Sequence, residues 1–161
     1  MIEDSQTFAQ TVSLPDLAAT QGLGARIAAG LGTGDAVALE GDLGAGKTTL
    51  ARAILRAAGI TEDVPSPTFT LVQVYETASL TVRHYDLYRI ENPNEVDELG
   101  LDDALSEGAA LIEWPERAEG RLPADVLHVA LTATGPRSRT ALLSGPAKWA
   151  FRFQQQEDHA R

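Results

Sequence analysis

The chain has 161 residues, 43% of them hydrophobic and 22% charged, a composition typical of one soluble globular domain with a sizeable core. It contains no cysteine, which excludes disulfides, thiol catalysis and cysteine-ligated metals, and no apolar run approaches the length of a membrane span. Acidic residues outnumber basic ones 23 to 13, so we do not expect direct nucleic-acid binding, and the acidic first residues do not resemble a secretory signal.

Three elements are expected before residue 41: a weak edge strand over residues 8–12, a helix over residues 13–31, and an apolar strand over residues 35–40. Ser13 suits the N-cap of that helix, and Pro15 suits its first turn. Gly22 and Gly24 weaken the helix, because glycine loses the most backbone freedom when it becomes ordered.

The rest of the chain alternates between helices and strands. A helix over residues 49–58 is followed by Gly59, which suits a C-cap, and Pro65 and Pro67 exclude a helix around them. The later elements are a hairpin over 69–75 and 80–88, short helices over 92–99 and 102–107, a strand over 109–112, a hairpin over 126–132 and 140–143, and a helix over 147–153. We therefore expect one domain over residues 1–153 and a frayed polar tail over residues 154–161.

A glycine-rich stretch, GDLGAGKTT, follows the first apolar strand at residues 41–49. Gly41, Gly46, Lys47 and Thr48 match G-x-x-x-x-G-K-[ST], the phosphate-binding loop. Lys47 adds a charge that reaches the β- and γ-phosphates, and the Thr48 hydroxyl suits Mg²⁺. The expected nucleotide-binding residues are Gly41, Asp42, Leu43, Gly44, Ala45, Gly46, Lys47, Thr48 and Thr49. We expect this loop to be exposed.

The elements around the loop favour a P-loop NTPase fold over a glycine-rich turn between two core elements. An apolar strand enters the loop and a helix with an apolar face leaves it, which is the context that the motif requires. The expected fold class is α/β, with a mainly parallel central sheet flanked by helices and antiparallel hairpin additions. Residues 97–100 match the D-x-x-G element of GTPases without an apolar strand before them, so ATP is favoured over GTP.

Two carboxylates stand at the ends of apolar strands, where ligands bind in sheets of this class. Asp86 ends the strand VRHYD, and Glu113 ends the strand AALIE. A lone acid in this position is more often a solvated residue, but two of them beside a phosphate loop favour a role with Mg²⁺ and water. We expect Thr48, Asp86 and Glu113 to surround one Mg²⁺, and Lys47, Asp86 and Glu113 to be the catalytic residues.

The segment Ser66-Pro-Thr-Phe69 is held extended by its flanking prolines. Ser66 and Thr68 suit a switch that senses the γ-phosphate or Mg²⁺. A rigid lead into the following strand is an equally good interpretation.

The three histidines, His84, His128 and His159, lie far apart and lack metal-ligand spacing. His84 stands two residues before Asp86 and shares its strand face. It is either packed in the core or a partner of the site, and packing is favoured.

Four motifs in chain order together resemble the TsaE (YjeE) family, the small bacterial ATPases of tRNA threonylcarbamoyladenosine biosynthesis. They are GDLGAGKTT at residues 41–49, SPTF at 66–69, HYDLYR at 84–89 and EWP at 113–115. The resemblance covers residues 35–123 strongly and the rest loosely. Residues 136–139 depart from the family pattern, which often has an acid after the glycine.

The resemblance implies a family member that binds ATP and Mg²⁺ through the phosphate loop, Thr48, Asp86 and Glu113. It also implies association with the TsaB–TsaD pair, whose TsaD subunit transfers a threonylcarbamoyl group to adenosine 37 of tRNAs reading ANN codons. ATP hydrolysis by the small subunit would then reset that assembly between rounds. The expected partners are TsaB and TsaD, with tRNA reached only through them, and neither DNA nor a membrane.

Two other classes of function share the phosphate loop. A small-molecule kinase needs an acceptor pocket and lid arginines, for which Arg117 and Arg121 are the candidates. A binding module that uses nucleotide only as a switch would show negligible hydrolysis even with its partner. The need for ATP leads us to expect a cytoplasmic location.

Overall fold

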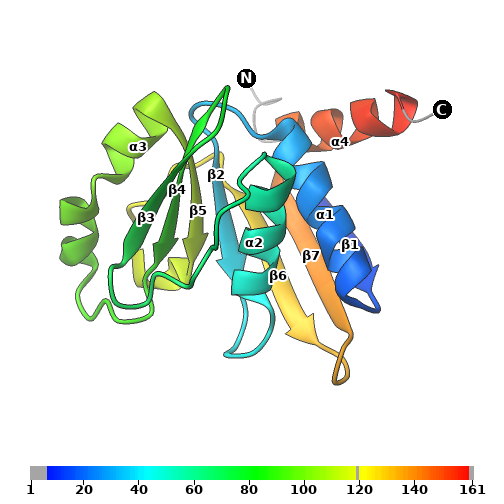
Figure 1. The fold of residues 1–161 in the computed structure, drawn as a ribbon, viewed down its shortest axis with the longest axis horizontal. Coiled ribbons are helices and arrows are strands. Elements are labelled where there is room, and N and C mark those ends of the chain that lie inside the picture. The colour runs from blue at the N-terminus through cyan, green and yellow to red at the C-terminus, as the bar shows by residue number, and fades with distance from the viewer. Residues whose placement is uncertain (1–6, 119, 160–161) are drawn as a thin grey trace.

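A seven-stranded β-sheet forms the centre of the molecule, with helices on both faces (Figure 1). The computed structural model describes residues 7–118 and 120–159. The strands are β1 (Thr7–Leu14), β2 (Ala36–Glu40), β3 (Val72–Glu76), β4 (Thr81–Asp86), β5 (Gly108–Glu113), β6 (Leu127–Ala133) and β7 (Arg139–Pro146). The helices are α1 (Leu17–Gly30), α2 (Lys47–Ala57), α3 (Leu101–Glu107) and α4 (Ala147–His159), with the 3₁₀ helices η2 (Pro93–Leu99) and η3 (Pro115–Ala118).

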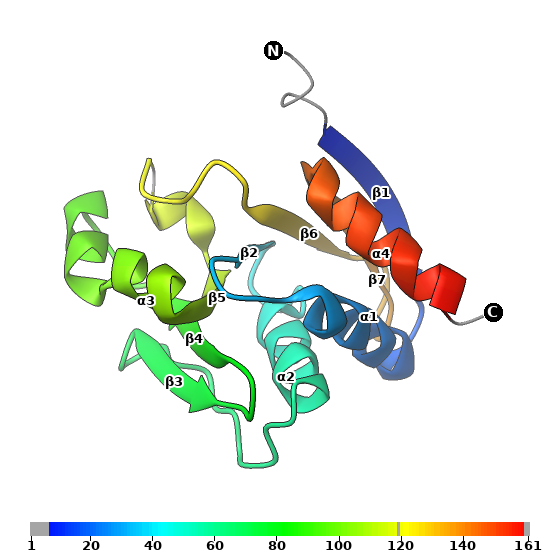
Figure 2. The same ribbon diagram turned by 90° about the horizontal axis from the view of Figure 1, so that it is seen from above.

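The strand order is β1-β7-β6-β2-β5-β4-β3, as Figure 2 shows along the curved sheet. The four central strands, β6, β2, β5 and β4, are parallel. Antiparallel strands extend the sheet at both sides, β3 beside β4 and the pair β7 and β1 beside β6. The predicted α/β class and both predicted hairpins are confirmed, although parallel pairs do not outnumber antiparallel ones: there are three of each.

Each face of the sheet carries its own hydrophobic core. Along β2, Val37 and Leu39 point toward the helices α1, α2 and α4, whereas Ala36 and Ala38 point toward α3 and the 3₁₀ helices. This alternation follows from the two-residue period of a strand. Because both faces of β2 are buried, its sequence is a continuous apolar run. The glycine-rich loop begins directly after the carboxyl end of this central strand.

The helix α1 packs directly against α2, and Gly24 of α1 allows the two helices to approach closely. A Cβ atom built on Gly24 would lie 2.5 Å from the Cβ of Ala53 on α2, nearer than real Cβ contacts come. Gly24, predicted only to weaken the helix, is therefore the contact that lets α1 approach α2.

The first helix begins later than predicted. Ser13 pairs with Thr140 of β7 and belongs to β1, so it cannot cap a helix. Asp16 is the N-cap instead, and its side chain accepts a hydrogen bond from the Ala19 N–H at 2.9 Å. The sheet pairing of β1 thus outweighs the local capping preference of Ser13.

The last helix extends further than predicted. Its expected end was Phe153, but α4 continues to His159, while residues 160–161 of the predicted tail and the acidic first six residues lie outside the described part of the chain. Trp149 and Phe153 are buried against the α1 side of the sheet. Among the described residues, no helix is both long and apolar enough to cross a membrane.

Candidate active site

The glycine-rich loop connects the end of β2 to the first turn of α2. Gly41 cannot be replaced by a residue with a side chain, because a Cβ there would lie 2.6 Å from the Leu131 carbonyl oxygen and its φ is 145°. Gly46 caps α2 without a side-chain hydrogen bond. The N–H groups of the first turn of α2 are therefore not capped by a side chain, and an anion suits that position.

A cavity of about 390 Å³ lies at this end of α2. Its lining includes most of the predicted site: Leu43, Gly44, Gly46, Lys47, Thr48, Thr49, Ser66, Thr68, Asp86 and Glu113. The structure thus brings together four segments that are far apart in sequence: the loop, the SPTF segment, the end of β4 and the end of β5. Gly41, Asp42 and Ala45 line a different cavity.

The carboxylates of Asp86 and Glu113 lie side by side because their strands are parallel and in register. Asp86 of β4 is paired with Glu113 of β5, so both side chains point to the α2 face of the sheet. Both residues are almost completely buried, with 4% and 2% of their surface exposed. Two carboxylates removed from water at the N-terminal end of a helix need polar partners, and each has them.

Glu113 is bonded to the loop. The Thr48 hydroxyl donates to its two carboxylate oxygens, at 2.8 and 3.0 Å. His84 contacts the same carboxylate, with 2.7 Å between Nε2 and Oε2. The prediction that His84 is simply packed was wrong, because this side chain belongs to the polar network of the site.

Asp86 is bonded to the SPTF segment. The hydroxyls of Ser66 and Thr68 each donate to its Oδ2 at 3.1 Å, and the Tyr88 backbone N–H donates to its Oδ1 at 3.0 Å. The two hydroxyls lie 2.9 Å apart. Ser66 and Thr68 therefore touch the predicted metal-binding carboxylate, whereas a rigid lead into a strand needs no such contact.

The loop was expected to be exposed, which is confirmed for residues 42–44 but is wrong for Lys47, because only 5% of its surface is accessible. Its ammonium group donates to the carbonyl oxygens of Gly41 and Asp42 at 2.5 and 2.9 Å and lies 4.0 Å from the centroid of the Trp114 ring. Burial lowers the pKa of Lys47, and the neighbouring carboxylates, Glu113 first, oppose that shift. In this structure the ammonium is therefore bonded to carbonyl groups of the loop.

The oxygen donors of the cavity match the protein ligands of a Mg²⁺ ion that is also bound by a phosphate. Among the described residues, no group of three or more His, Cys, Asp or Glu side chains forms a metal cage. Magnesium is usually held by one or two carboxylates, several waters and substrate phosphates, and the oxygens of Thr48, Asp86 and Glu113 match that donor set.

Three residues that line the cavity were not among the predicted site residues: Tyr88, Trp114 and Arg139. Arg139, at the start of β7, donates to the carbonyl oxygens of Gly44 and Ala45 at 3.1 and 3.0 Å. The sequence did offer a signal, because Arg139 is the last residue of the stretch 136–139 that departs from the family pattern.

A second cavity, of about 470 Å³, adjoins the first and shares Gly46, Thr49 and Arg139 with it. Its other walls come from the start of α1 and from β6: Asp16, Leu17, Ala18, Thr20 and Leu131, with Ala45 and Arg137. We call the cavity of about 390 Å³ the phosphate cavity, because residues of the phosphate-loop motif line it. A ligand that extends beyond it along the loop would enter this second, mixed polar and apolar space.

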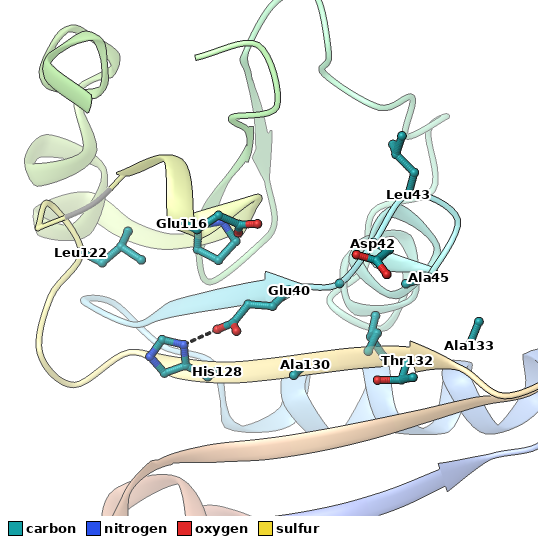
Figure 3. A pocket seen from close by; sticks show the side chains of 13 residues that line it. Glu40, Asp42, Leu43, Ala45, Glu116, Leu122, His128, Ala130, Thr132 and Ala133 are labelled. Atoms are coloured by element: carbon teal, nitrogen blue, oxygen red, sulfur yellow. Dashed lines mark hydrogen bonds and ion pairs between the residues drawn. The ribbon is translucent and has the colours of Figure 1, made fainter. Parts of the chain in front are cut away.

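A third and larger cavity, of about 780 Å³, is lined by the first half of the glycine-rich loop and by β6 (Figure 3). Glu40 at the end of β2 points toward His128 on β6, with 2.5 Å between Oε2 and Nδ1. Asp42 and Glu116 add two more carboxylates. This concentration of acids is unfavourable for a triphosphate, whereas the cavity of about 390 Å³ contains Lys47 and the start of α2.

Sequence comparisons agree on one family. The family model described as threonylcarbamoyl adenosine biosynthesis protein TsaE matches residues 14–141. The tRNA threonylcarbamoyladenosine biosynthesis protein TsaE of Rickettsia felis is 40% identical over 121 residues, covering 74% of this chain and 71% of the relative. The protein of the same name from a Nostoc species is 38% identical over 148 residues, covering 88% and 90%.

The crystal structure of Bacillus subtilis YdiB is similar over 97% of this chain and 99% of that chain, with a TM-score of 0.80 and 26% identity. The fold and the site define an α/β protein whose glycine-rich loop joins a central parallel strand to a helix. The chain belongs to the TsaE family of threonylcarbamoyl adenosine biosynthesis proteins. The resemblance seen in the four sequence motifs is confirmed.

Proposed function

We propose that this chain is a Mg²⁺-dependent P-loop ATPase that binds the TsaB–TsaD complex and drives its turnover in the threonylcarbamoylation of adenosine 37 in tRNAs reading ANN codons. The observation that carries the ATPase assignment is the contact between Thr48 and Glu113 in the cavity at the start of α2. The phosphate-loop pattern assigns the Thr48 hydroxyl to Mg²⁺, and the fold supplies a buried carboxylate at that atom.

Different residues of the two adjoining cavities are assigned to the phosphates, the magnesium ion and the nucleoside. The uncapped N–H groups of α2 bind the phosphates, and Lys47 turns from the loop carbonyls to the β- and γ-phosphate oxygens. Thr48, Asp86 and Glu113 would hold Mg²⁺ directly or through its waters, and the ion would supply positive charge to offset that of the phosphates. The nucleoside extends into the adjoining cavity beside Leu17.

The kinase alternative is less well supported. Arg117 and Arg121, its candidate lid arginines, do not line the phosphate cavity. Arg117 donates instead to the Ile90 carbonyl oxygen, and Arg121 forms an ion pair with Asp97.

The route to tRNA is indirect. A net charge of −10 opposes binding to a polyanion, because affinity for nucleic acid depends largely on basic groups that replace counterions at the phosphates. A cytoplasmic location, where ATP and tRNA are available, fits this role.

Co-purification tests the partner assignment. We expect this chain to elute with TsaB and TsaD in size-exclusion chromatography when ATP and Mg²⁺ are present, and to elute separately from tRNA when tested alone. Separate elution from TsaB–TsaD both with and without ATP would contradict the partner assignment. A stable complex of the isolated chain with tRNA would contradict the indirect route.

The SPTF segment is proposed to order on the γ-phosphate and to report its presence to the partners. The double variant Ser66→Ala with Thr68→Ala removes both hydroxyls from Asp86 and is expected to bind ATP but to lose partner-stimulated hydrolysis and multiple-turnover modification. Fluorescent-nucleotide binding, phosphate release and modified-tRNA counts measure the three properties.

The matched control is Thr70→Ala with Ser79→Ala, which removes the same two hydroxyl types from exposed positions that do not line the cavity. This control is expected to behave as the wild type. Full stimulation of the Ser66 and Thr68 double variant by the partners would remove the switch from the proposal.

A further inference from the structure

His84 lies on the side of β4 that faces α2, two residues before Asp86. None of its surface is exposed, and its Nε2 atom is 2.7 Å from Oε2 of Glu113. His84 is neither part of the phosphate-loop motif nor one of the proposed magnesium ligands. A polar ring in a fully buried strand position costs free energy unless its hydrogen bonds compensate, so its contacts indicate what it does.

The hydrogen-bond partners of the ring identify its tautomer. An ionised carboxylate can only accept, so the contact with Glu113 requires the proton on Nε2. The other ring nitrogen, Nδ1, is buried and has no hydrogen-bond partner among the described residues. A hydrogen on Nδ1 would have no acceptor among the described residues, so Glu113 is the acceptor that the ring can reach. The contact with Glu113 therefore places a ring hydrogen on Nε2.

The donor from His84 complements the donor from Thr48. Thr48 reaches Glu113 from the loop, and His84 reaches it from the neighbouring strand, so the carboxylate is fixed from two sides. With Glu113 almost fully buried, water is poorly placed to replace a missing donor. Resting on the proposed ATPase function, we infer that His84 is a positioning residue that fixes Glu113 in the orientation required for magnesium and water.

Three substitutions at His84 separate positioning from packing. In His84→Gln the side-chain amide nitrogen occupies about the place of Nε2 and can still donate to Glu113. In His84→Asn the amide nitrogen is nearer to the place of Nδ1 and cannot reach it. His84→Leu fills the space without any donor. Gln and Asn differ by one methylene, so their comparison tests the donor rather than the polarity.

We expect His84→Leu and His84→Asn to lower kcat about tenfold or more and to raise the Mg²⁺ concentration for half-maximal rate, as loss of a partner to a metal ligand does. KM for ATP should change little, because the loop contacts remain. His84→Gln should recover most of kcat. Circular dichroism and thermal unfolding establish that each variant is folded. Equal rates for folded Gln and Asn variants would overturn the inference.

A second readout does not depend on activity. The chain has three histidines, so the ring nitrogens of His84 can be assigned in a two-bond ¹⁵N–¹H spectrum by their absence from His84→Gln. We expect a hydrogen on Nε2 in the protein without nucleotide. Hydrogen on Nδ1 alone would overturn the inference even if the chain hydrolyses ATP. If the wild type proves inactive while His84 shows the expected tautomer, the proposed function fails and the bond to Glu113 stands.

Discussion

Lys47→Ala should lower the rate of phosphate release from ATP by about 10²–10³-fold, the range seen when one preorganised group at a developing charge is removed. Lys47 is the lysine of the phosphate-loop motif, and its ammonium lies among the groups that line the phosphate cavity. The alanine variant keeps the N–H groups of α2, so weakened nucleotide binding should remain measurable by fluorescence of a labelled ATP.

The same variant should also be less stable, because Lys47 is buried and bonded to the carbonyl oxygens of Gly41 and Asp42. Loss of these charge-assisted bonds should cost about 1–3 kcal/mol in the free energy of unfolding, measured by urea denaturation. The control is Lys148→Ala on α4, which removes a lysine far from the cavity lining and should leave hydrolysis unchanged. Wild-type phosphate release by folded Lys47→Ala would refute the site.

Glu113→Gln should lower kcat by about 10²–10³-fold, because it removes a carboxylate that holds magnesium or orients the attacking water while keeping the size of the side chain. Its amide oxygen can still accept from Thr48, so ATP binding should persist. A titration of phosphate release against Mg²⁺ separates a lost metal contact, which raises the half-maximal concentration, from lost water activation, which lowers only the maximum.

The matched control for this prediction is Glu116→Gln, three residues along the chain. Glu116 is exposed and lines the acidic cavity of Figure 3, not the phosphate cavity. It should retain wild-type kcat and magnesium dependence. A Glu113→Gln variant indistinguishable from this control would exclude Glu113 from catalysis.

The sequence predicted the parts of the site that depend on local pattern or on strand position. The loop was visible from its glycine and lysine spacing, and its strand and helix from their apolar periodicity. The positions of Asp86 and Glu113 at one edge of the sheet could be predicted, because neighbouring parallel strands end on the same side. Ser66 and Thr68 were open to two interpretations, because their contacts with Asp86 depend on how a loop folds back on β4.

The remaining site residues depend on contacts that no local pattern encodes. His84 on β4 contacts Glu113 on the neighbouring strand β5, and Arg139 reaches the loop from β7. Trp114 has a positive φ of 59° and lies over Lys47, although nothing in its sequence neighbourhood indicated that conformation. The N-cap error had the same origin, since only the pairing of β1 with β7 shows that Ser13 is in a strand.

The most direct test of the proposed function is the initial rate of phosphate release from ATP and Mg²⁺, measured without any acceptor substrate, with and without TsaB–TsaD. We predict slow release by the chain alone, complete dependence on Mg²⁺, and faster release when TsaB–TsaD is added. Absence of phosphate release under both conditions would contradict the account and would leave a kinase or a nucleotide-dependent binding module as the better description.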